Sequence, residues 1–453
     1  MNKLADRSAI WLLCLAFSGC ATLPSDGGMS NIQQSTRLHT GKDIQLVKTE
    51  RDQQSITART DELLQAPLTV EDAVQIALLN NKGLQATLYE VGVSEADLVQ
   101  ASRLPNPRFS ILRTRNGDDY KIEQAFTFNI FALFTMPMAK QLSQQRLEQT
   151  RTQVKLEVID LAADTRKAYF KAIAAEQGLG YMNQVKLAAE ASAELATKMA
   201  QAGNFSKLDQ SREQVFSAEI TSEYKGSAQR AYATRELLIR KMGLVGKQTD
   251  FKLPERLPDL PDQLKPAADV SADAIQQRLD IQAMQQQVAT LAKNLGLTKT
   301  TRFINVLEIG PARVLEGKRS DPYKNGFELS LELPIFDFGT AKVARAEAIY
   351  MQAMNRAAEQ AVNAQSELRE AYFNYQSSYE VAKHYRDDIV PLRKRIAEEN
   401  QLRYNGMLIS VFELLADAQT QISSVNSYIQ ALRDFWLADA ELQSAITGKP
   451  LKE

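Results

Sequence analysis

A strict alternation of apolar and polar residues marks a short stretch between positions 325 and 333. The apolar members are Phe327, Leu329, Leu331 and Leu333, and the polar members are Glu328, Ser330 and Glu332. A second stretch behaves in the same way, because Phe126, Phe128 and Ile130 alternate with polar neighbours. A period of two is typical of a strand with one apolar and one wet face. We therefore expect both stretches to be strands of this kind.

Most of the remaining chain has the pattern of long helices. From about Lys140 to Ala202, apolar residues recur every seven positions, at Leu147, Val154, Leu161, Ala168, Ala175, Met182, Ala189 and Ala196. A sustained heptad predicts coiled-coil-like packing, here in a helix roughly 90 Å long at the usual rise. A short turn at Ala202–Lys207 and a returning helix to about Lys241 are expected next. An opening helix is expected at Leu68–Arg103, with Thr69 as its N-cap.

Two β-hairpins are expected between these helices. In the first half the strands are predicted at Asn106–Thr114 and Glu123–Phe131, with a turn in Arg115–Asp119 that contains the favourable pair Asn-Gly. In the second half they are predicted near Phe303–Ile309 and at Phe327–Leu333.

The chain contains an internal duplication. The triplet Ala168-Tyr169-Phe170 recurs as Ala371-Tyr372-Phe373 at an offset of 203, and the same offset carries Gly203 onto Gly406. Earlier in each half an offset of 197 carries Pro137 onto Pro334. Because two segments keep their register around one small insertion, we infer a true duplication of a helix, hairpin and long helical hairpin.

The duplication sets the expected domain boundaries. The first repeat covers about 68–250 and the second about 269–450. The segment 251–268 between them carries four prolines and is predicted to be an extended linker. The polar segment 20–67 has little periodicity and is predicted to be an extended N-terminal arm.

The N-terminus is expected to be a targeting segment rather than part of the fold. Basic Lys3 and Arg7 flank a short apolar run, and Ser18-Gly19-Cys20 follows it. This arrangement resembles the bacterial lipoprotein box, which implies a signal peptide at 1–19 and a lipid on Cys20. Ala21 then favours the outer membrane by resemblance to lipoprotein sorting signals. The alternative is an ordinary signal peptide with an incidental cysteine.

The composition argues against a catalytic site, a metal site or a nucleic-acid-binding surface. The 54 basic and 55 acidic residues nearly balance, so no nucleic-acid surface is expected. The only cysteines are Cys14 and Cys20, and the only histidines, His39 and His384, lie far apart. We therefore expect no catalytic residues, no bound cofactor and no metal site, and predict that the chain is not an enzyme.

The strand count constrains any membrane role. After Cys20 the sequence has no run of 18 apolar residues, as a membrane-crossing helix would need. Four strands from one chain are too few to close a membrane barrel, which needs at least about eight. A membrane-spanning form therefore requires self-association.

The order and spacing of several motifs, in duplicate, resemble the TolC family of outer-membrane efflux channels. The matching stretches are LTVEDAVQIALLNN, ASRLPNPRFS, the AYF triplets, the turn glycines and LPIFDFG, and together they span about Leu68 to Gly448. The resemblance implies a mainly α fold with a small β part. Long helical hairpin rods would form a tunnel, and four strands would join a trimeric, twelve-stranded transmembrane β-barrel.

The resemblance also implies a function. The protein would be a homotrimeric, lipid-anchored exit channel in the outer membrane, extending into the periplasm and gated at its helical tip. Its partners would be outer-membrane lipid, a periplasmic adaptor (membrane fusion) protein and an inner-membrane pump.

Roles for single residues follow from the same resemblance. Lipid would contact Phe126, Phe128, Ile130, Phe327, Leu329, Leu331 and Leu333, and the lumen would be lined by Glu328, Ser330 and Glu332. The periplasmic tips that contact the adaptor would be Gly203, Asn204, Phe205, Ser206, Gly406, Met407, Leu408 and Ile409. Asp209 would carry charge at the closed aperture; the offset of 203 pairs it with Phe412, and the neighbouring Glu413 would supply the second acid.

Several alternatives stay open at this level. The strands could belong to a soluble sandwich, the tip glycines could serve turn geometry alone, and Asp209 could be an ordinary surface acid. The chain could be a periplasmic coiled-coil adaptor of an exporter. As an outer-membrane duct, it could serve type I protein secretion or metal efflux instead of drug export.

Overall fold

A computed structural model describes residues 28–264, 275, 278–303 and 306–449. The chain divides into two compact units. A sheet unit contains Tyr89–Val154 and Ile281–Gln360, together with residues 28–30. A helical unit contains Asn31–Leu88, Lys155–Asp280 and Ala361–Glu453. Each unit therefore takes segments from both sequence repeats.

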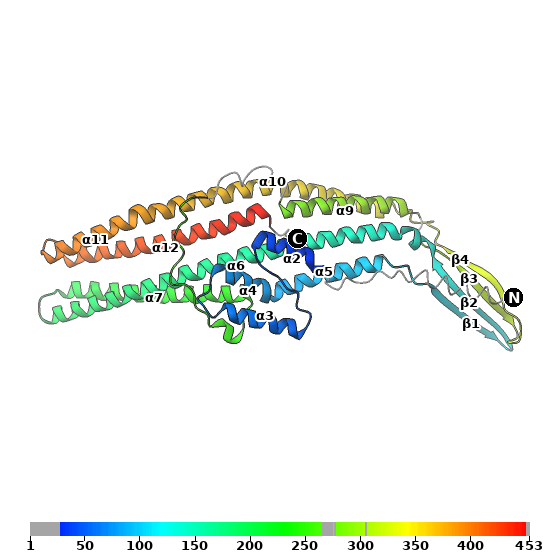
Figure 1. Cartoon of the computed structure of the whole chain (residues 1–453), viewed down its shortest axis with the longest axis horizontal. Coiled ribbons are helices and arrows are strands. Elements are labelled where there is room, and N and C mark those ends of the chain that lie inside the picture. Colours follow the sequence, from blue (N-terminus) through cyan, green and yellow to red (C-terminus); the bar gives the residue numbers. More distant parts are fainter. Residues whose placement is uncertain (1–27, 265–274, 276–277, 304–305, 450–453) are drawn as a thin grey trace. The chain divides into compact units, whose positions relative to one another are not determined.

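The elements follow one another in the order of two similar halves (Figure 1). The first half contains α2 (Met29–Thr40), α3 (Glu50–Leu63), α4 (Val70–Asn80), α5 (Lys82–Ala101), β1 (Arg108–Asn116), β2 (Asp119–Asn129), α6 (Ile130–Gln201), α7 (Lys207–Met242) and the 3₁₀ turn η1 (Gly246–Thr249). The second half contains α9 (Leu279–Thr301), β3 (Leu307–Gly317), β4 (Lys324–Leu331), α10 (Thr340–His384), the π-turn η3 (Tyr385–Ile389), α11 (Val390–Asn405) and α12 (Val411–Thr447).

The four strands form one antiparallel sheet in the order β1-β2-β3-β4. The first hairpin closes at Asn116↔Asp119 through Gly117, whose φ of 62° suits the tight turn. Both predicted hairpins are confirmed. The third strand begins later in the sequence than expected: β3 starts at Leu307 and not near Phe303.

The start of the long helix corrects one prediction. Ile130 was expected in the second strand, but it is the first residue of α6. The side chain of Asn129 accepts a hydrogen bond from the N–H of Ala132 at 2.7 Å, as an N-cap does. This cap starts the helix ten residues before Lys140 and leaves Pro137 within it.

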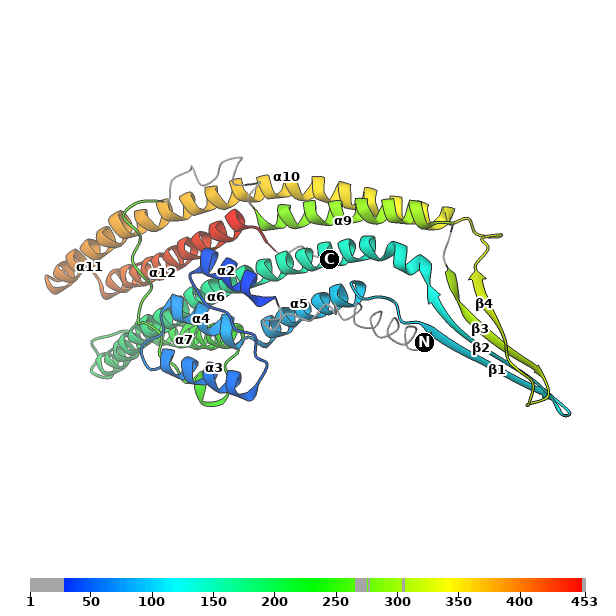
Figure 2. The same ribbon diagram turned by 45° about the vertical axis from the view of Figure 1, so that its right-hand side comes forward.

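The heptad of α6 forms a buried seam, as predicted. Six of its eight members are buried and the other two are half-buried; the buried ones are Leu147, Val154, Ala168, Met182, Ala189 and Ala196. In the helical unit, α6 runs beside α7, to which it is joined by the ion pairs Arg235–Glu176 and Lys241–Asp164. Likewise, α11 runs beside α12 (Figure 2).

The main core of the helical unit lies where α4, α6, α7, α10 and α12 meet. The described part of the proline-rich segment, 251–264, is not helical and crosses this core, burying Phe251, Leu257 and Leu260. Its carbonyl groups accept hydrogen bonds from two aromatic side chains, Trp436 at Pro258 (3.0 Å) and Tyr379 at Pro261 (3.2 Å). The segment is therefore a structural strap as well as a linker.

The opening helix is interrupted once. Thr69 caps α4 as predicted, accepting a hydrogen bond from the N–H of Asp72. At Asn81 the backbone leaves the helical region. The side-chain amide of Asn81 donates a hydrogen bond to the backbone carbonyl of Lys241 at 3.0 Å. A new helix, α5, then begins at Lys82.

The N-terminal arm is not extended over its described part, which corrects a second prediction. It folds into α2 and α3, and a capping box of Thr49 and Asp52 starts α3. The arm buries Ile32, Thr36, Ile56 and Thr60. Since half of these are threonines, the hydrophobic period of the helices is hidden in the sequence.

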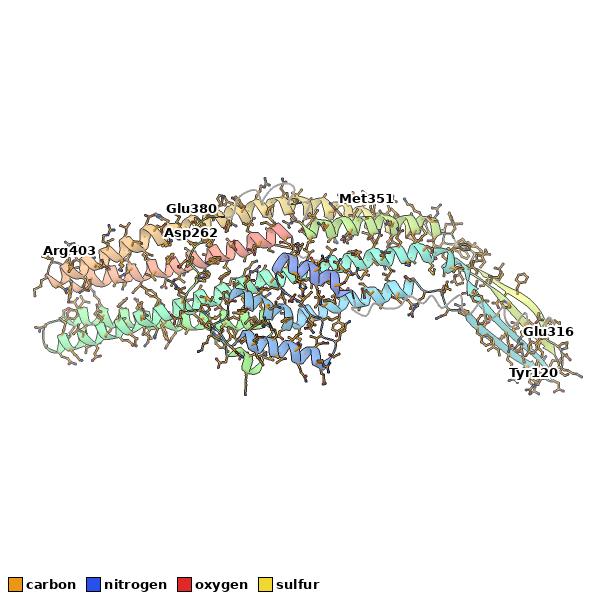
Figure 3. The ribbon with its side chains drawn as sticks, viewed as in Figure 1. Tyr120, Asp262, Glu316, Met351, Glu380 and Arg403 are labelled. Carbon is orange, nitrogen blue, oxygen red and sulfur yellow. The ribbon has the colours of Figure 1, made fainter. Side chains whose placement is uncertain are left out.

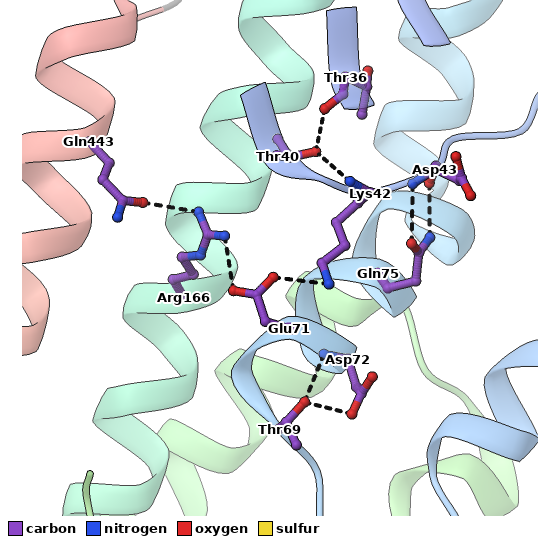
Figure 4. A network of polar contacts seen from close by, with 10 residues as sticks. All are labelled: Thr36, Thr40, Lys42, Asp43, Thr69, Glu71, Asp72, Gln75, Arg166 and Gln443. Atoms are coloured by element: carbon purple, nitrogen blue, oxygen red, sulfur yellow. Dashed lines mark hydrogen bonds and ion pairs between the residues drawn. The ribbon is translucent and has the colours of Figure 1, made fainter. Parts of the chain in front are cut away.

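Glu71 links the arm to two helices of the core (Figure 4). Its carboxylate lies 2.9 Å from the amine of Lys42 in the arm and 3.2 Å from the guanidinium of Arg166 in α6. Arg166 also donates to Gln443 of α12 at 3.2 Å. Burial alone would raise the pKa of Glu71, but the hydrogen bond from Lys42 and the charge of Arg166 outweigh it and lower the pKa.

A buried arginine connects the start of the second repeat to its last helix, α12. Arg278 donates to both carboxylate oxygens of Asp280, at 3.0 and 2.7 Å, and both side chains are fully buried. The same guanidinium donates to the carbonyl of Ala445 at 2.9 Å, in the last turn of α12. The pair thus satisfies its own hydrogen bonds and caps a helix end.

We predict that Glu71→Gln lowers the melting temperature by about 1–3 °C at pH 7. Since the folded pKa of Glu71 lies below its ordinary value of 4.5, its ionised form stabilises the fold above that pH. This contribution is lost as the pH falls from 4.5 through the folded pKa, so the difference between the two melting temperatures should be smaller at about pH 3 than at pH 7.

Melting followed by tryptophan fluorescence at both pH values measures this difference. Glu62→Gln is the control, because its ion pair with Arg59 is exposed, and it should change the melting temperature little at either pH. An E71Q deficit of equal size at both pH values would contradict the assignment.

Candidate functional site

The register of the sheet places its side chains on two different faces. The pairs Phe109↔Phe126, Phe128↔Ile309 and Ile309↔Leu329 lie on one face, because paired residues point to the same side of a sheet. This side is called the apolar face. Phe327 is 75 % exposed, Phe109 62 % and Leu329 57 %. So many exposed large side chains on one face indicate contact with a nonpolar surface.

The opposite side, called the charged face, is polar or small along most of its length. Glu308 lies 3.4 Å from Arg108 and accepts a hydrogen bond from Thr127 at 3.3 Å. Two further ion pairs lie on this face, Lys121–Glu123 at 2.8 Å and Lys324–Glu316 at 3.5 Å. These groups need water or ionic partners.

The predicted strand residues separate between the faces as expected, with exceptions at the strand ends. Phe126, Phe128, Phe327, Leu329 and Leu331 lie on the apolar face, and Glu328 and Ser330 lie on the charged face. Glu332 and Leu333 follow the end of β4, and Ile130 belongs to α6.

The apolar surface also extends beyond the predicted residues. Phe109, Ile111, Ile309 and Pro311 share the apolar face, and the alternation in RFSILRT and LEIGPARV could have identified them. After β4 the loop exposes Leu333, Ile335, Phe336 and Phe338.

The strands pack closely at Gly310 of β3. A Cβ atom there would lie 1.9 Å from the carbonyl oxygen of Phe126. Only glycine therefore fits at this point of the β2–β3 ladder.

The two outer strands, β1 and β4, are the edges of the sheet. Along each edge, half of the backbone N–H and C=O groups point away from the sheet and are available to pair with another strand.

The first helical tip joins α6 to α7. Gly203 has a φ of 79°, its N–H donates to Ala200, and the N–H of Asn204 donates to Met199. These two bonds form a Schellman motif. Ser206 then caps α7 by accepting from the N–H of Asp209 at 3.1 Å. Phe205 is half-buried.

The second tip repeats this geometry one residue later than the offset of 203 predicts. Met407, not Gly406, takes the left-handed conformation, with φ of 58°. The N–H of Met407 donates to Tyr404, and the N–H of Leu408 donates to Arg403 (labelled in Figure 3). Ser410 caps α12, so Gly203 corresponds to Met407 and Ser206 to Ser410. Met407 is 93 % exposed and Leu408 is also exposed.

The extra residue of the second repeat is absorbed by the π-turn η3. Here the N–H of Val390 donates to Tyr385, five residues back, where an α-helix would use four. Pro391 follows and has no N–H to offer the carbonyl of Asp387. In α6 the α-helix continues without such a turn up to Gln201.

The shifted register changes how the tip acids correspond. Asp209 and Glu413 both occupy the third position of their helices, and each accepts a hydrogen bond from its capping serine or that residue's backbone. They are therefore equivalent, and Phe412 is not the counterpart of Asp209. Both carboxylates stabilise a helix N-terminus; their place at an aperture stays a prediction.

The described part of the chain has neither a membrane-crossing helix nor a cluster of metal ligands. No helix there is long and apolar enough to cross a membrane. Among the same residues, no group of three histidine, cysteine or acidic side chains could hold a metal ion. Cys20 and the predicted signal peptide lie outside the described residues.

Comparison with known proteins gives several similar solved structures. No protein-family model and no curated protein sequence matches the chain. A membrane protein from Pseudomonas aeruginosa has a TM-score of 0.71 at 17% identity, covering 83% of this chain and 92% of its own. The Campylobacter jejuni CmeC outer membrane channel has a TM-score of 0.70 at 14% identity, covering 91% of both chains.

A third structure is the open state of the Neisseria gonorrhoeae MtrE outer membrane channel. Its TM-score is 0.66 at 16% identity, covering 84% of this chain and 89% of its own. These likenesses cover 83%, 91% and 84% of this chain. The chain therefore has the fold of the TolC-type outer-membrane channels, as its motifs implied.

We predict opposite effects of substitution at the two tips. Gly203→Ala places a Cβ in the left-handed region and should destabilise its turn by about 1 kcal/mol. Met407→Gly removes the same strain and should slow local opening of the second tip. Hydrogen exchange of the tip amides measures both effects.

Gly178→Ala in α6 is the control, because an added Cβ there meets no atom within 4 Å. It should stabilise its helix by about 0.5–1 kcal/mol. Faster exchange in the Met407→Gly tip would show that the left-handed residue of that turn has been misassigned.

Proposed function

We propose that this chain is one subunit of a homotrimeric outer-membrane channel of the TolC family, the exit duct of a tripartite efflux system. The observation that carries the proposal is the sheet, with one exposed apolar face, one charged face and two available edges. It is supported by the fold, which the chain shares with proteins described as outer membrane channels.

The sheet has the properties of one third of a membrane barrel. Lipid cannot hydrogen-bond backbone groups, so every strand edge within a membrane must be paired. Three copies supply twelve strands, and pairing β4 of one copy with β1 of the next leaves no edge. The apolar face then contacts lipid, and the charged face, with Glu308, Glu328 and Ser330, lines a water-filled lumen.

The second helical hairpin supports a threefold assembly. Phe170 of α6 is 5 % exposed and stacks on Trp436 at 5.2 Å, whereas its repeat counterpart, Phe373 of α10, is 68 % exposed. Val362 of α10 and Leu392 of α11 are exposed as well. In the trimer, a second copy of the chain covers this surface.

The tips are the proposed contact site for a periplasmic adaptor, which in turn joins an inner-membrane pump. Exposed Met407 and Leu408 on the second turn, and Leu208 beside the first, offer apolar contacts at the ends of rigid helices. Asp209 and Glu413 lie one turn inside and carry the charge proposed for the aperture. Gating is a movement of these helix ends, and the pump supplies the energy.

The duct is passive in this proposal, so the pump selects the cargo. The same geometry serves drug, metal-ion or protein export. The alternative, that the chain is itself a periplasmic adaptor, is disfavoured because its fold is that of the channels.

A lipid on Cys20 would anchor each subunit to the outer membrane, with the helical unit in the periplasm.

We predict that Leu329→Arg prevents assembly in the outer membrane, whereas Ser330→Arg permits it. The two residues are neighbours on opposite faces of β4. An arginine facing lipid costs about 2–4 kcal/mol per subunit at mid-membrane, and one facing water costs little. The amount of SDS-resistant trimer in outer-membrane fractions measures assembly.

The same variants complement a deletion strain in a susceptibility panel of lipophilic drugs, detergents and copper, silver, zinc, cadmium and cobalt salts. Ser330→Arg should restore resistance, and Leu329→Arg should not. The cargo belongs to the class of compound to which Ser330→Arg restores resistance and Leu329→Arg does not. Equal assembly of both variants would refute the assignment of the two faces.

A further inference from the structure

The apolar face changes character toward the closed ends of the hairpins. Arg113 and Arg115 of β1 and Arg313 of β3 lie on this face, in the register rows beyond Phe109, Phe126 and Phe327. Tyr120 pairs with Arg115 in the same register. These three arginines, with Tyr120 and Tyr323, are called the arginine band; Figure 3 labels Tyr120 near the hairpin turns.

Charge is sorted between the two faces of the strands. Every acidic residue within β1–β4 lies on the charged face: Asp119, Glu123, Glu308, Glu316 and Glu328. On the apolar face the only charged strand residues are the three arginines, and all three are exposed. A surface with cations and no anions on its own strands attracts an anionic partner.

Aromatic rings hold the guanidinium groups in place. The guanidinium carbons of Arg113 and Arg115 lie 5.6 and 5.3 Å from the ring centre of Tyr120. That of Arg313 lies 4.9 Å from the ring centre of Tyr323. Such contacts orient an arginine without neutralising it.

The hydrogen bonds of the band leave donors available. Arg313 donates one Nε–H to Gln124 at 2.6 Å, and Arg115 donates one to the carbonyl of Gly117 at 2.7 Å. Asp118, in the turn, approaches Arg115 only to 3.8 Å. Each guanidinium has five N–H groups in a planar fork that matches phosphate oxygens.

We propose that the arginine band binds the phosphate groups of lipid A, the anchor of lipopolysaccharide in the outer leaflet of the outer membrane. This inference rests on the proposed function. Both hairpin turns lie at the end of the sheet opposite the helices α6, α9 and α10, which adjoin the other ends of the strands. With the helices in the periplasm, the band lies at the outer surface. Tyrosine beside arginine is the composition expected at a lipid headgroup boundary.

The test is native mass spectrometry of the detergent-solubilised full chain titrated with diphosphoryl lipid A. The triple variant R113Q/R115Q/R313Q should bind this lipid at least about tenfold more weakly than the wild type. The matched control is R108Q/K121Q/K324Q, which removes the same number of positive charges from the charged face. It should bind within about twofold of the wild type.

A lysine triple variant, R113K/R115K/R313K, guards against misfolding of the glutamine variant. It keeps the charge but loses the planar fork, and it should bind at least about threefold more weakly. Undiminished binding by both band variants, or an equal loss in the control, would overturn the proposal. So would equal binding of phosphatidylglycerol or of dephosphorylated lipid A.

Failure of the arginine-band proposal can be distinguished from failure of the proposed channel function. If the wild-type chain forms no outer-membrane trimer, the proposed function fails. If it forms the trimer but both band variants bind lipid A as the wild type does, only the arginine band is wrong.

Discussion

The unpaired edges of the four-stranded sheet are the constraint on which the rest of the structure depends. A backbone N–H or C=O group in lipid without a partner costs several kcal/mol, so a membrane sheet has to close on itself. The described part of this chain has four strands, too few to close a barrel alone. The edge strands, β1 and β4, come from different repeats. In the proposed channel, closure therefore requires copies of the whole chain, and the helices that adjoin the strands are brought together with them.

The two repeats share one plan but differ in their tip turns, in one inserted residue and in their exposed surface. Both tips use a Schellman motif followed by a serine cap, but one has glycine and the other Met407 at the left-handed position. The second repeat accommodates an extra residue in the π-turn at Tyr385–Ile389. Phe170 is buried within its own chain and Phe373 is exposed. The second hairpin thus differs in helical phase and in exposed surface, two properties that a partner can recognise.

Much of this architecture could be predicted from the sequence because its elements are long and periodic. The strand faces follow from a period of two, and the seam of α6 follows from its heptad. The features that the sequence pattern did not predict depend on local details such as a capping hydrogen bond or a buried threonine. The cap at Asn129 moved Ile130 into a helix, and buried Thr36 and Thr60 concealed the helices of the arm. The tip register was misjudged because a glycine was expected where Met407 carries the positive φ.

Disulfide crosslinking between the two sheet edges tests the central claim most directly. The only cysteines of the chain are Cys14 and Cys20, so a cysteine at Ser330 of β4 can be combined with a scan along β1 from 108 to 116. Closure predicts crosslinked dimers and trimers, nothing larger, and a maximum at every second position of β1. Absence of crosslinks between chains, or a ladder that continues beyond the trimer, would contradict a closed barrel of three subunits.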